Sequence, residues 1–207
     1  MLFIYKCGTT SLKVSLPFTT ESLVLDANRF GSTIATEFGS LSKLTRLELS
    51  SNSFTGTVPS TFKNLDFETL RLNLNPGLSG PILDFVDSWS NLKYFSIRSC
   101  AFTGTIPSTI SGLTRLTHLS MGPDISGMLP SDIVKLTNLQ ELDIQGLRVG
   151  GTFPTQIHKM SNLRKFWSVV LQSCSPFTLV SHKTYQKSDS SLILQAFRVR
   201  SQSQLAL

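Results

Sequence analysis

One pattern, Leu-x-x-Leu-x-Leu-x-x-Asn-x-Phe-x-Gly-x-Ile-Pro, recurs six times between about Ser22 and Leu163. The clearest copy begins at Leu44 and ends at Pro59. From the second copy on, the opening residues are 23, 25, 24, 23 and 24 positions apart. They are Leu44, Phe67, Leu92, Leu116, Leu139 and Leu163, the last of which opens a broken seventh copy. Such a fixed period predicts a solenoid, in which each copy is one structural unit stacked on the next.

Each copy predicts a strand, a corner and a short return. Hydrophobic and polar residues alternate over residues 47–49, which indicates a strand with its leucines inward. Gly56 suits a bend or a close backbone approach. Pro59 cannot donate into a sheet, so the chain leaves the strand ladder there. The spacing of Phe62 and Leu65 then predicts a single short helical turn.

No copy can bury its own leucines alone, so stacked copies must share a core. We therefore predict an α/β leucine-rich repeat solenoid of about six repeats, with a parallel sheet on its concave face. After each strand, an Asn amide can satisfy backbone groups that a tight corner would bury unpaired. The predicted structural ladder of corner residues is Asn28, Asn52, Asn75, Cys100 and Asp124. Leu147 breaks it, which predicts a looser corner in the sixth repeat.

Residues 54–59 and 102–107 read Phe-Thr-Gly-Thr-Val-Pro and Phe-Thr-Gly-Thr-Ile-Pro, the signature of plant-type repeats. Over about residues 20–167 the chain resembles the ectodomain of a plant leucine-rich repeat receptor-like serine/threonine kinase. Residues 22–28, 83–89 and 121–127 are similar to the subfamily that carries a malectin-like domain.

The resemblance implies display at the plasma membrane, a protein or peptide ligand, possible pairing with a co-receptor, and signalling through an intracellular kinase. The kinase motifs and a malectin-like domain are absent from the sequence. No stretch reaches the roughly 18–20 apolar residues of a membrane span, and residues 1–5 are too short for a signal-peptide core. The alternative is a stand-alone secreted inhibitor or decoy that uses the same face.

We expect three parts: an incomplete N-terminal cap over 1–20, the repeat domain over 21–167, and a basic Ser-rich tail over 168–207. The cap holds only Cys7, where the resembled ectodomains carry paired cysteines. Residues 1–163 carry 13 Lys and Arg against 12 Asp and Glu, whereas residues 164–207 carry six against one. Because the pattern stops within a repeat near Trp167, the tail is predicted to be disordered or non-native sequence, as from an altered splice.

Nothing in the sequence predicts an enzyme, a cofactor, a metal site or nucleic-acid binding. The three cysteines are widely spaced, which argues against a disulfide framework. His118, His158 and His182 lack metal-ligand spacing. No Ser-His-Asp or paired-carboxylate arrangement stands out from the repeats. The basic residues of the tail lie among serines without aromatic residues between them, so a solvated segment is the expected reading.

The outward-facing strand positions should tile the concave face. Arg and Tyr are enriched where binding energy concentrates, and Arg grips carboxylates with two hydrogen bonds. The predicted ligand-binding residues on this face are Arg46, Glu48, Arg71, Tyr94, Arg98, His118 and Asp143. The alternative is that these are ordinary solvated positions of the sheet.

Overall fold

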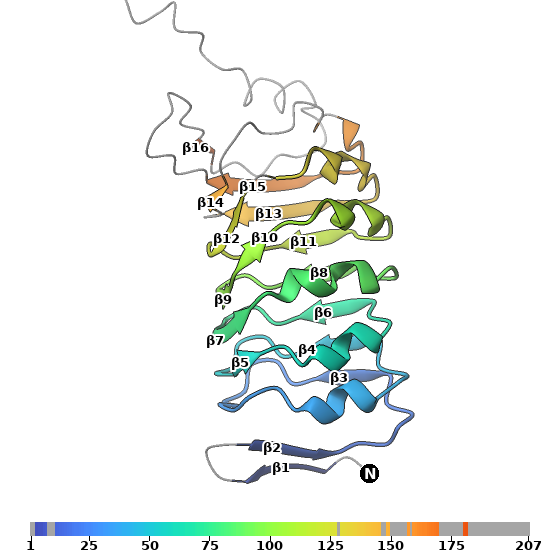
Figure 1. The fold of residues 1–207 in the computed structure, drawn as a ribbon, viewed down its shortest axis with the longest axis vertical. Coiled ribbons are helices and arrows are strands. Elements are labelled where there is room, and N and C mark those ends of the chain that lie inside the picture. Colours follow the sequence, from blue (N-terminus) through green and yellow to red (C-terminus); the bar gives the residue numbers. More distant parts are fainter. Residues whose placement is uncertain are drawn as a thin grey trace, which may run out of the picture.

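The computed structural model describes residues 3–7, 11–127, 129–145, 148–149, 157, 159–169 and 180–181. The repeats stack along the long axis of the molecule (Figure 1). The looser corner predicted at Leu147, together with His158, His182 and nearly all of the predicted tail, lies outside the described residues.

A single eight-stranded sheet forms one side of the solenoid. Seven strands are parallel, one from each repeat, and β16 (Val180–Ser181) adds an antiparallel edge. The parallel strands are β3 (Ser22–Val24), β4 (Arg46–Glu48), β6 (Thr69–Arg71), β8 (Tyr94–Ser96), β11 (His118–Ser120), β13 (Glu141–Gln145) and β15 (Lys165–Val169). Their register aligns each strand leucine with its counterpart in the next repeat, as Leu47 with Leu70. The predicted parallel sheet and solenoid fold are thereby confirmed.

The segments between corner and proline form two further sheets, which the sequence did not predict. One contains β5 (Thr55–Thr57), β7 (Asn75–Gly80) and β9 (Cys100–Phe102). The other contains β10 (Gly104–Thr105), β12 (Ile125–Gly127) and β14 (Arg148–Val149). Stacking brings these segments side by side, but five of the six strands have only two or three residues, too few to produce a recognisable alternation.

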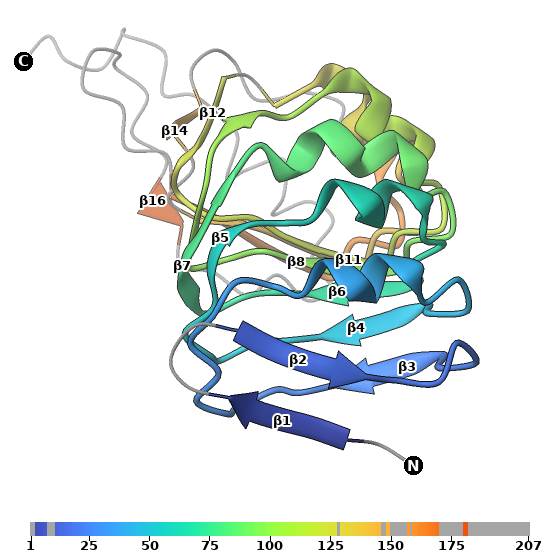
Figure 2. The ribbon, with the colours of Figure 1, turned by 60° about the horizontal axis from the view of Figure 1, so that its bottom comes forward.

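The returns are 3-10 turns and lie on the side opposite the eight-stranded sheet (Figure 2). They are η1 (Thr36–Ser40), η2 (Ser60–Asn64), η3 (Ile82–Ser88), η4 (Ser108–Gly112) and η5 (Ser131–Lys135). A proline immediately precedes each of the last four, and these are Pro59, Pro81, Pro107 and Pro130. A segment of five to seven residues gives room for a 3-10 turn rather than a regular α-helix.

The repeat glycines permit both a special backbone conformation and a close approach. Gly56 and Gly80 have φ of 77° and 91°, in the left-handed region that side chains disfavour. A Cβ at either position would lie 3.1 or 3.0 Å from the Cγ2 of Thr33 or Thr57, in the preceding repeat. The sequence-based reading of these glycines is thus correct on both counts.

The core runs through the stack as one continuous cluster of leucines, isoleucines and aromatic residues. Its largest fully buried side chain is Trp89, which forms edge-on contacts with Phe67 and Phe95. The Trp89 indole Nε1–H also donates to the Phe62 carbonyl at 3.0 Å, so it ties two repeats together. An antiparallel hairpin, β1 (Phe3–Cys7) and β2 (Ser11–Ser15), lies at the N-terminal end of the stack (Figure 1).

Candidate ligand-binding face

The solvent side of the eight-stranded sheet, which we call the concave face, carries six of the seven predicted binding residues in two aligned rows, and Arg98 follows the end of β8. One row follows Arg46, Thr69, Tyr94, His118, Glu141 and Lys165 along successive strands. The next row follows Glu48, Arg71, Ser96, Ser120, Asp143 and Trp167. Neighbouring positions belong to adjacent strands, roughly 4.8 Å apart, so long side chains reach one another.

Glu48 lies at the N-terminal side of this face and is held by two arginines. Its carboxylate pairs with Arg46 at 2.6 Å and with Arg71 at 3.2 Å. Only 4% of Glu48 is exposed, because both guanidinium groups cover it. Glu48 therefore orients Arg46 and Arg71 and offers little surface of its own to a ligand.

The centre of the face is a stack of one guanidinium and two rings. The Arg71 guanidinium carbon lies 5.1 Å from the centre of the Tyr94 ring. On its other side Tyr94 stacks against His118, with ring centres 4.5 Å apart and planes inclined by 20°. Arg71 Nε is buried and has no hydrogen-bond partner among the described residues, so the guanidinium contacts the ring and not a second acceptor through that atom. The sequence predicted these three residues separately, and the structure brings them together.

His118 connects the stack to the C-terminal side of the face. Its Nε2 lies 3.8 Å from Glu141 Oε1, and Lys165 Nζ lies 2.5 Å from the same oxygen. Burial lowers the pKa of His118, and the cations Lys165 and Arg71 act in the same direction, while Glu141 opposes them. The ring is therefore neutral at pH 7.

Arg98 and Asp143 pair at 2.8 Å although their strands are not neighbours. The intervening repeat has Gly122 at the position equivalent to Arg98. Ser120 also reaches the Asp143 carboxylate, at 3.5 Å. This pair spans two repeats, a connection that the sequence pattern does not reveal.

Lys165 and Trp167 were missed as members of the face. Lys165 Nζ lies 5.9 Å from the centre of the Trp167 ring, and both residues belong to β15. The signal was present in the sequence, because the start of a seventh repeat at Leu163 places residues 165 and 167 at outward strand positions. On β15 the concave face therefore carries the Lys165 ammonium over the Trp167 ring.

The corner ladder is strongest in the second and third repeats. The Asn52 amide donates to the carbonyls of Leu25, Leu49 and Ser50 at 2.9–3.1 Å, and its Oδ1 accepts from the Phe30 N–H. Asn75 repeats this arrangement one step further along. Both residues bind carbonyls of their own and of the preceding repeat.

The other ladder positions differ from this arrangement. Asn28 is exposed and donates to the carbonyls of Leu25 and Asp26, within its own repeat. Cys100 is buried, and its thiol lies 3.1 Å from the Leu72 carbonyl. Burial raises the pKa of the Cys100 thiol to about 11, so it stays protonated and unreactive at neutral pH. Asp124 is exposed in a turn.

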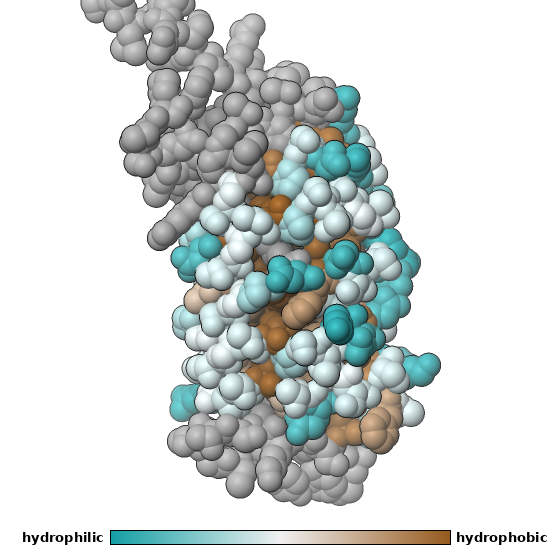
Figure 3. Space-filling view, viewed as in Figure 1, coloured by the Kyte–Doolittle hydropathy of each residue, from teal (hydrophilic) through white to brown (hydrophobic). Residues whose placement is uncertain are grey.

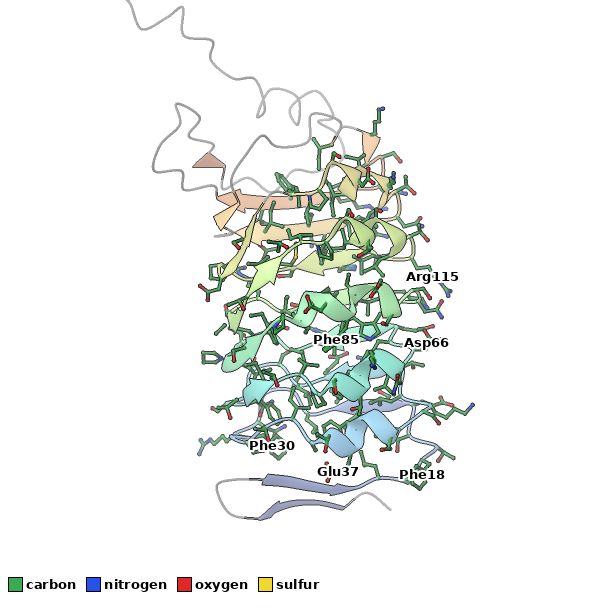
Figure 4. All side chains as sticks on the ribbon, in the orientation of Figure 1. Phe18, Phe30, Glu37, Asp66, Phe85 and Arg115 are labelled. Carbon is green, nitrogen blue, oxygen red and sulfur yellow. The ribbon has the colours of Figure 1, made fainter. Side chains whose placement is uncertain are left out.

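Two other surfaces of the solenoid are the side of the 3-10 turns and a lateral side. The side of the 3-10 turns is mostly polar, with small apolar areas between polar groups (Figure 3). Asp66 and Arg115 lie on one lateral side (Figure 4), where Asn91 donates to the Asp66 carboxylate and accepts from Arg115. Among the residues that the structure describes, no three His, Cys, Asp or Glu side chains form a cluster suited to a metal ion. Within the same part of the chain, no helix is long and apolar enough to cross a bilayer.

The stacked strands, the Gly-Pro crossings and the outward polar rows define a leucine-rich repeat protein. Residues 43–65 and 91–113 match the family described as Leucine Rich Repeat. Receptor-like protein 41 of Arabidopsis thaliana is 31% identical over 152 residues, which cover 71% of this chain and 17% of that protein. The chain is similar to plant receptor ectodomains of this class and spans 17% of the length of that relative.

Solved structures of plant receptors show the same similarity. The ectodomain of the Arabidopsis thaliana receptor kinase GASSHO1/SCHENGEN3, in complex with CASPARIAN STRIP INTEGRITY FACTOR 2, is 28% identical with a TM-score of 0.64. It matches 72% of this chain, which covers 18% of the ectodomain. The plant peptide hormone receptor RGFR1, in complex with RGF2, is 29% identical with a TM-score of 0.66, over 73% of this chain and 24% of its own. The Arabidopsis receptor kinase HAESA, with the peptide hormone IDA and the co-receptor SERK1, is 26% identical with a TM-score of 0.66, over 72% and 26%.

Proposed function

We propose that this chain is a non-catalytic ligand-binding module of a plant cell-surface receptor, and that its concave face binds a protein or peptide. The central observation is the continuous series of contacts from Glu48 through Arg71, Tyr94 and His118 to Glu141 and Lys165. It crosses six adjacent strands and holds its side chains in fixed positions before any ligand arrives. Preorganised Arg and Tyr side chains reduce the entropy cost of binding.

The similar structures of a peptide hormone receptor with RGF2 and of HAESA with the peptide hormone IDA support this proposal. By the same resemblance we propose signalling at the plasma membrane, through a serine/threonine kinase outside this chain and in concert with a co-receptor. Membership of the malectin-carrying subfamily is proposed on the sequence segments 22–28, 83–89 and 121–127 alone.

Within the face, we propose that Arg46, Arg71, Tyr94, Arg98, His118 and Asp143 contact the ligand. Glu48 acts indirectly, by holding Arg46 and Arg71 in place. Lys165 and Trp167 extend the same surface and are added to the contact residues.

A selection with a random peptide phage library on the whole chain tests the proposal. Enriched peptides should bind the wild-type chain and lose roughly tenfold or more affinity on Tyr94→Ala. The control is Lys63→Ala, because Lys63 is exposed on η2, on the opposite side of the solenoid. Peptides that bind Tyr94→Ala as tightly as wild type and lose affinity only on Lys63→Ala would place the binding surface on the other side.

A further inference from the structure

The Thr117 hydroxyl links His118 to the neighbouring strand. Its Oγ1 lies 2.8 Å from the Lys93 carbonyl and 2.8 Å from His118 Nδ1. When the hydroxyl hydrogen points to the carbonyl, Nδ1–H is the donor in the second contact. In that tautomer of the neutral ring, Nε2 is an acceptor with an open lone pair.

This acceptor faces a second acceptor. Nε2 lies 3.8 Å from Glu141 Oε1, and two lone pairs cannot form a hydrogen bond with each other. Glu141 is neutralised from the other direction by Lys165, whose Nζ lies 2.5 Å from the same Oε1. One proton on Nε2 would supply the missing donor between His118 and Glu141.

We propose that neutral His118 is the Nδ1–H tautomer and that it is a proton-operated switch in the concave face: protonation of Nε2 pairs His118 with Glu141 and loosens Lys165 from that carboxylate. The proton comes from solvent, and no covalent bond other than N–H forms. The face gains one positive charge, and the Lys165 ammonium is released beside the Trp167 ring.

Charged and titratable groups from each neighbouring strand act on this switch. On one side, Tyr94 of β8 covers one face of the ring, with Arg71 of β6 behind it. On the other side are Glu141 of β13 and Lys165 of β15. Two further groups have partners elsewhere, Lys93 with Glu68 at 2.9 Å and Asp143 with Arg98 at 2.8 Å. Burial, Lys165 and Arg71 lower the pKa of His118, so the switch operates below its ordinary value of 6.5.

The consequence for binding rests on the proposed function. A concave face that gains positive charge in acid should bind anionic ligands more tightly at low pH than at neutral pH. The switch itself requires no ligand, so it can be tested separately from the binding proposal.

The test is NMR titration of the histidine ring nitrogens in the full chain between about pH 4.5 and 8, a range that brackets the ordinary histidine pKa. At the alkaline end the His118 ring should show the Nδ1–H tautomer. Lys165→Met should raise the pKa of His118 by about one unit, and Glu141→Gln should lower it by about the same amount. The ¹⁵Nζ signal of Lys165 should shift with the same midpoint as His118.

The matched control is Lys135→Met, because Lys135 pairs with Asp132 on η5, on the opposite side of the solenoid. It should leave the His118 midpoint unchanged. An Nε2–H tautomer at the alkaline end, or a His118 midpoint that is the same in wild type and Lys165→Met, would overturn the switch. Neither result would affect the peptide-binding proposal, which the phage selection tests independently.

Discussion

The second and third repeats join their neighbours differently from the fourth and fifth. In the former, Asn52 and Asn75 are buried and bind carbonyls of two repeats. In the fourth repeat the thiol of Cys100 replaces the amide, and in the fifth Asp124 turns to solvent. The apolar core is the same in both halves, since Met121 and Ile125 are buried as completely as Leu49 and Phe54. The second and third repeats, which we call the polar half, thus add buried polar bonds to a core that the fourth and fifth share.

The largest expected effect is the loss of the amide in the polar half. Asn75→Ala removes three donated bonds and leaves the Phe54 N–H without its acceptor. Because orphaned buried groups cost about 1–3 kcal/mol each, we expect unfolding free energy to fall by about 3 kcal/mol or more. Chemical denaturation of the wild type and the variant measures this loss of unfolding free energy.

The matched variant in the other half is Cys100→Ala, which removes one weak thiol donor. It should cost about 1 kcal/mol, since little polar bonding is lost. Equal losses for the two variants would show that the halves are joined in the same way, and would contradict the comparison.

The next effect concerns a contact inside the polar half, where Trp89 links the third repeat to the second. Trp89→Phe keeps an aromatic ring but leaves the Phe62 carbonyl without the indole donor. We expect a loss of about 2 kcal/mol in unfolding free energy. Phe85→Leu is the control, because Phe85 is only half-buried and contacts Trp89 from outside the core (Figure 4). A greater loss from that control would mean that packing, and not the hydrogen bond, dominates at Trp89.

A gain in stability is expected at one corner of the polar half. Leu74 has φ of 60°, a left-handed conformation that costs a side chain such as leucine about 1 kcal/mol. Leu74 is also half-exposed, so Leu74→Asn loses little burial and should raise the unfolding free energy by about that amount. Val24→Asn is matched in exposure but lies in the extended strand β3, and it should give no gain. A thermal melt distinguishes the two.

The smallest effect concerns the carboxylate next to Glu48. Burial, more than the neighbouring Glu48 carboxylate, raises the pKa of Asp26 above its ordinary value of 3.8. The native state therefore holds this proton more tightly than the unfolded state, and stability falls as pH rises through the raised pKa. Asp26→Asn should stabilise the chain at pH 7 by no more than about 1 kcal/mol, since the group is partly solvated.

The gain from Asp26→Asn should shrink as pH falls toward 3.8, the ordinary pKa of the group, because the wild-type carboxyl becomes protonated in both states. The amide oxygen introduced by this substitution can still accept the Ser50 N–H, which the Asp26 carboxylate accepts at 2.6 Å. A gain that stays constant across this pH range would show that the benefit is not electrostatic. Denaturation at about pH 4 and about pH 7 separates these outcomes.

The sequence predicted what depends on local pattern and could not predict what depends on the choice of partner. Leucine alternation, the glycine bends and the proline exits each follow from a few consecutive residues. The pairing of Arg98 with Asp143 does not, because it joins residues two repeats apart. Arg71 likewise contacts both Glu48 and Tyr94, and a one-dimensional pattern cannot rank such cross-strand partners.

The position of Trp89 has a mechanical consequence. If the chain is held at both ends and stretched, tension is borne by the interfaces between repeats, and the weakest should open first. Buried side-chain amides and the indole tie the first three repeats across their boundaries, whereas the amides of Asn138 and Asn162, which bridge repeats beyond Cys100, are exposed. We therefore expect extension to begin in the C-terminal repeats and to pause at the third, a step that force spectroscopy on the stretched chain would resolve. Trp89→Phe should shorten that pause, and an unchanged pause would locate the resistance elsewhere.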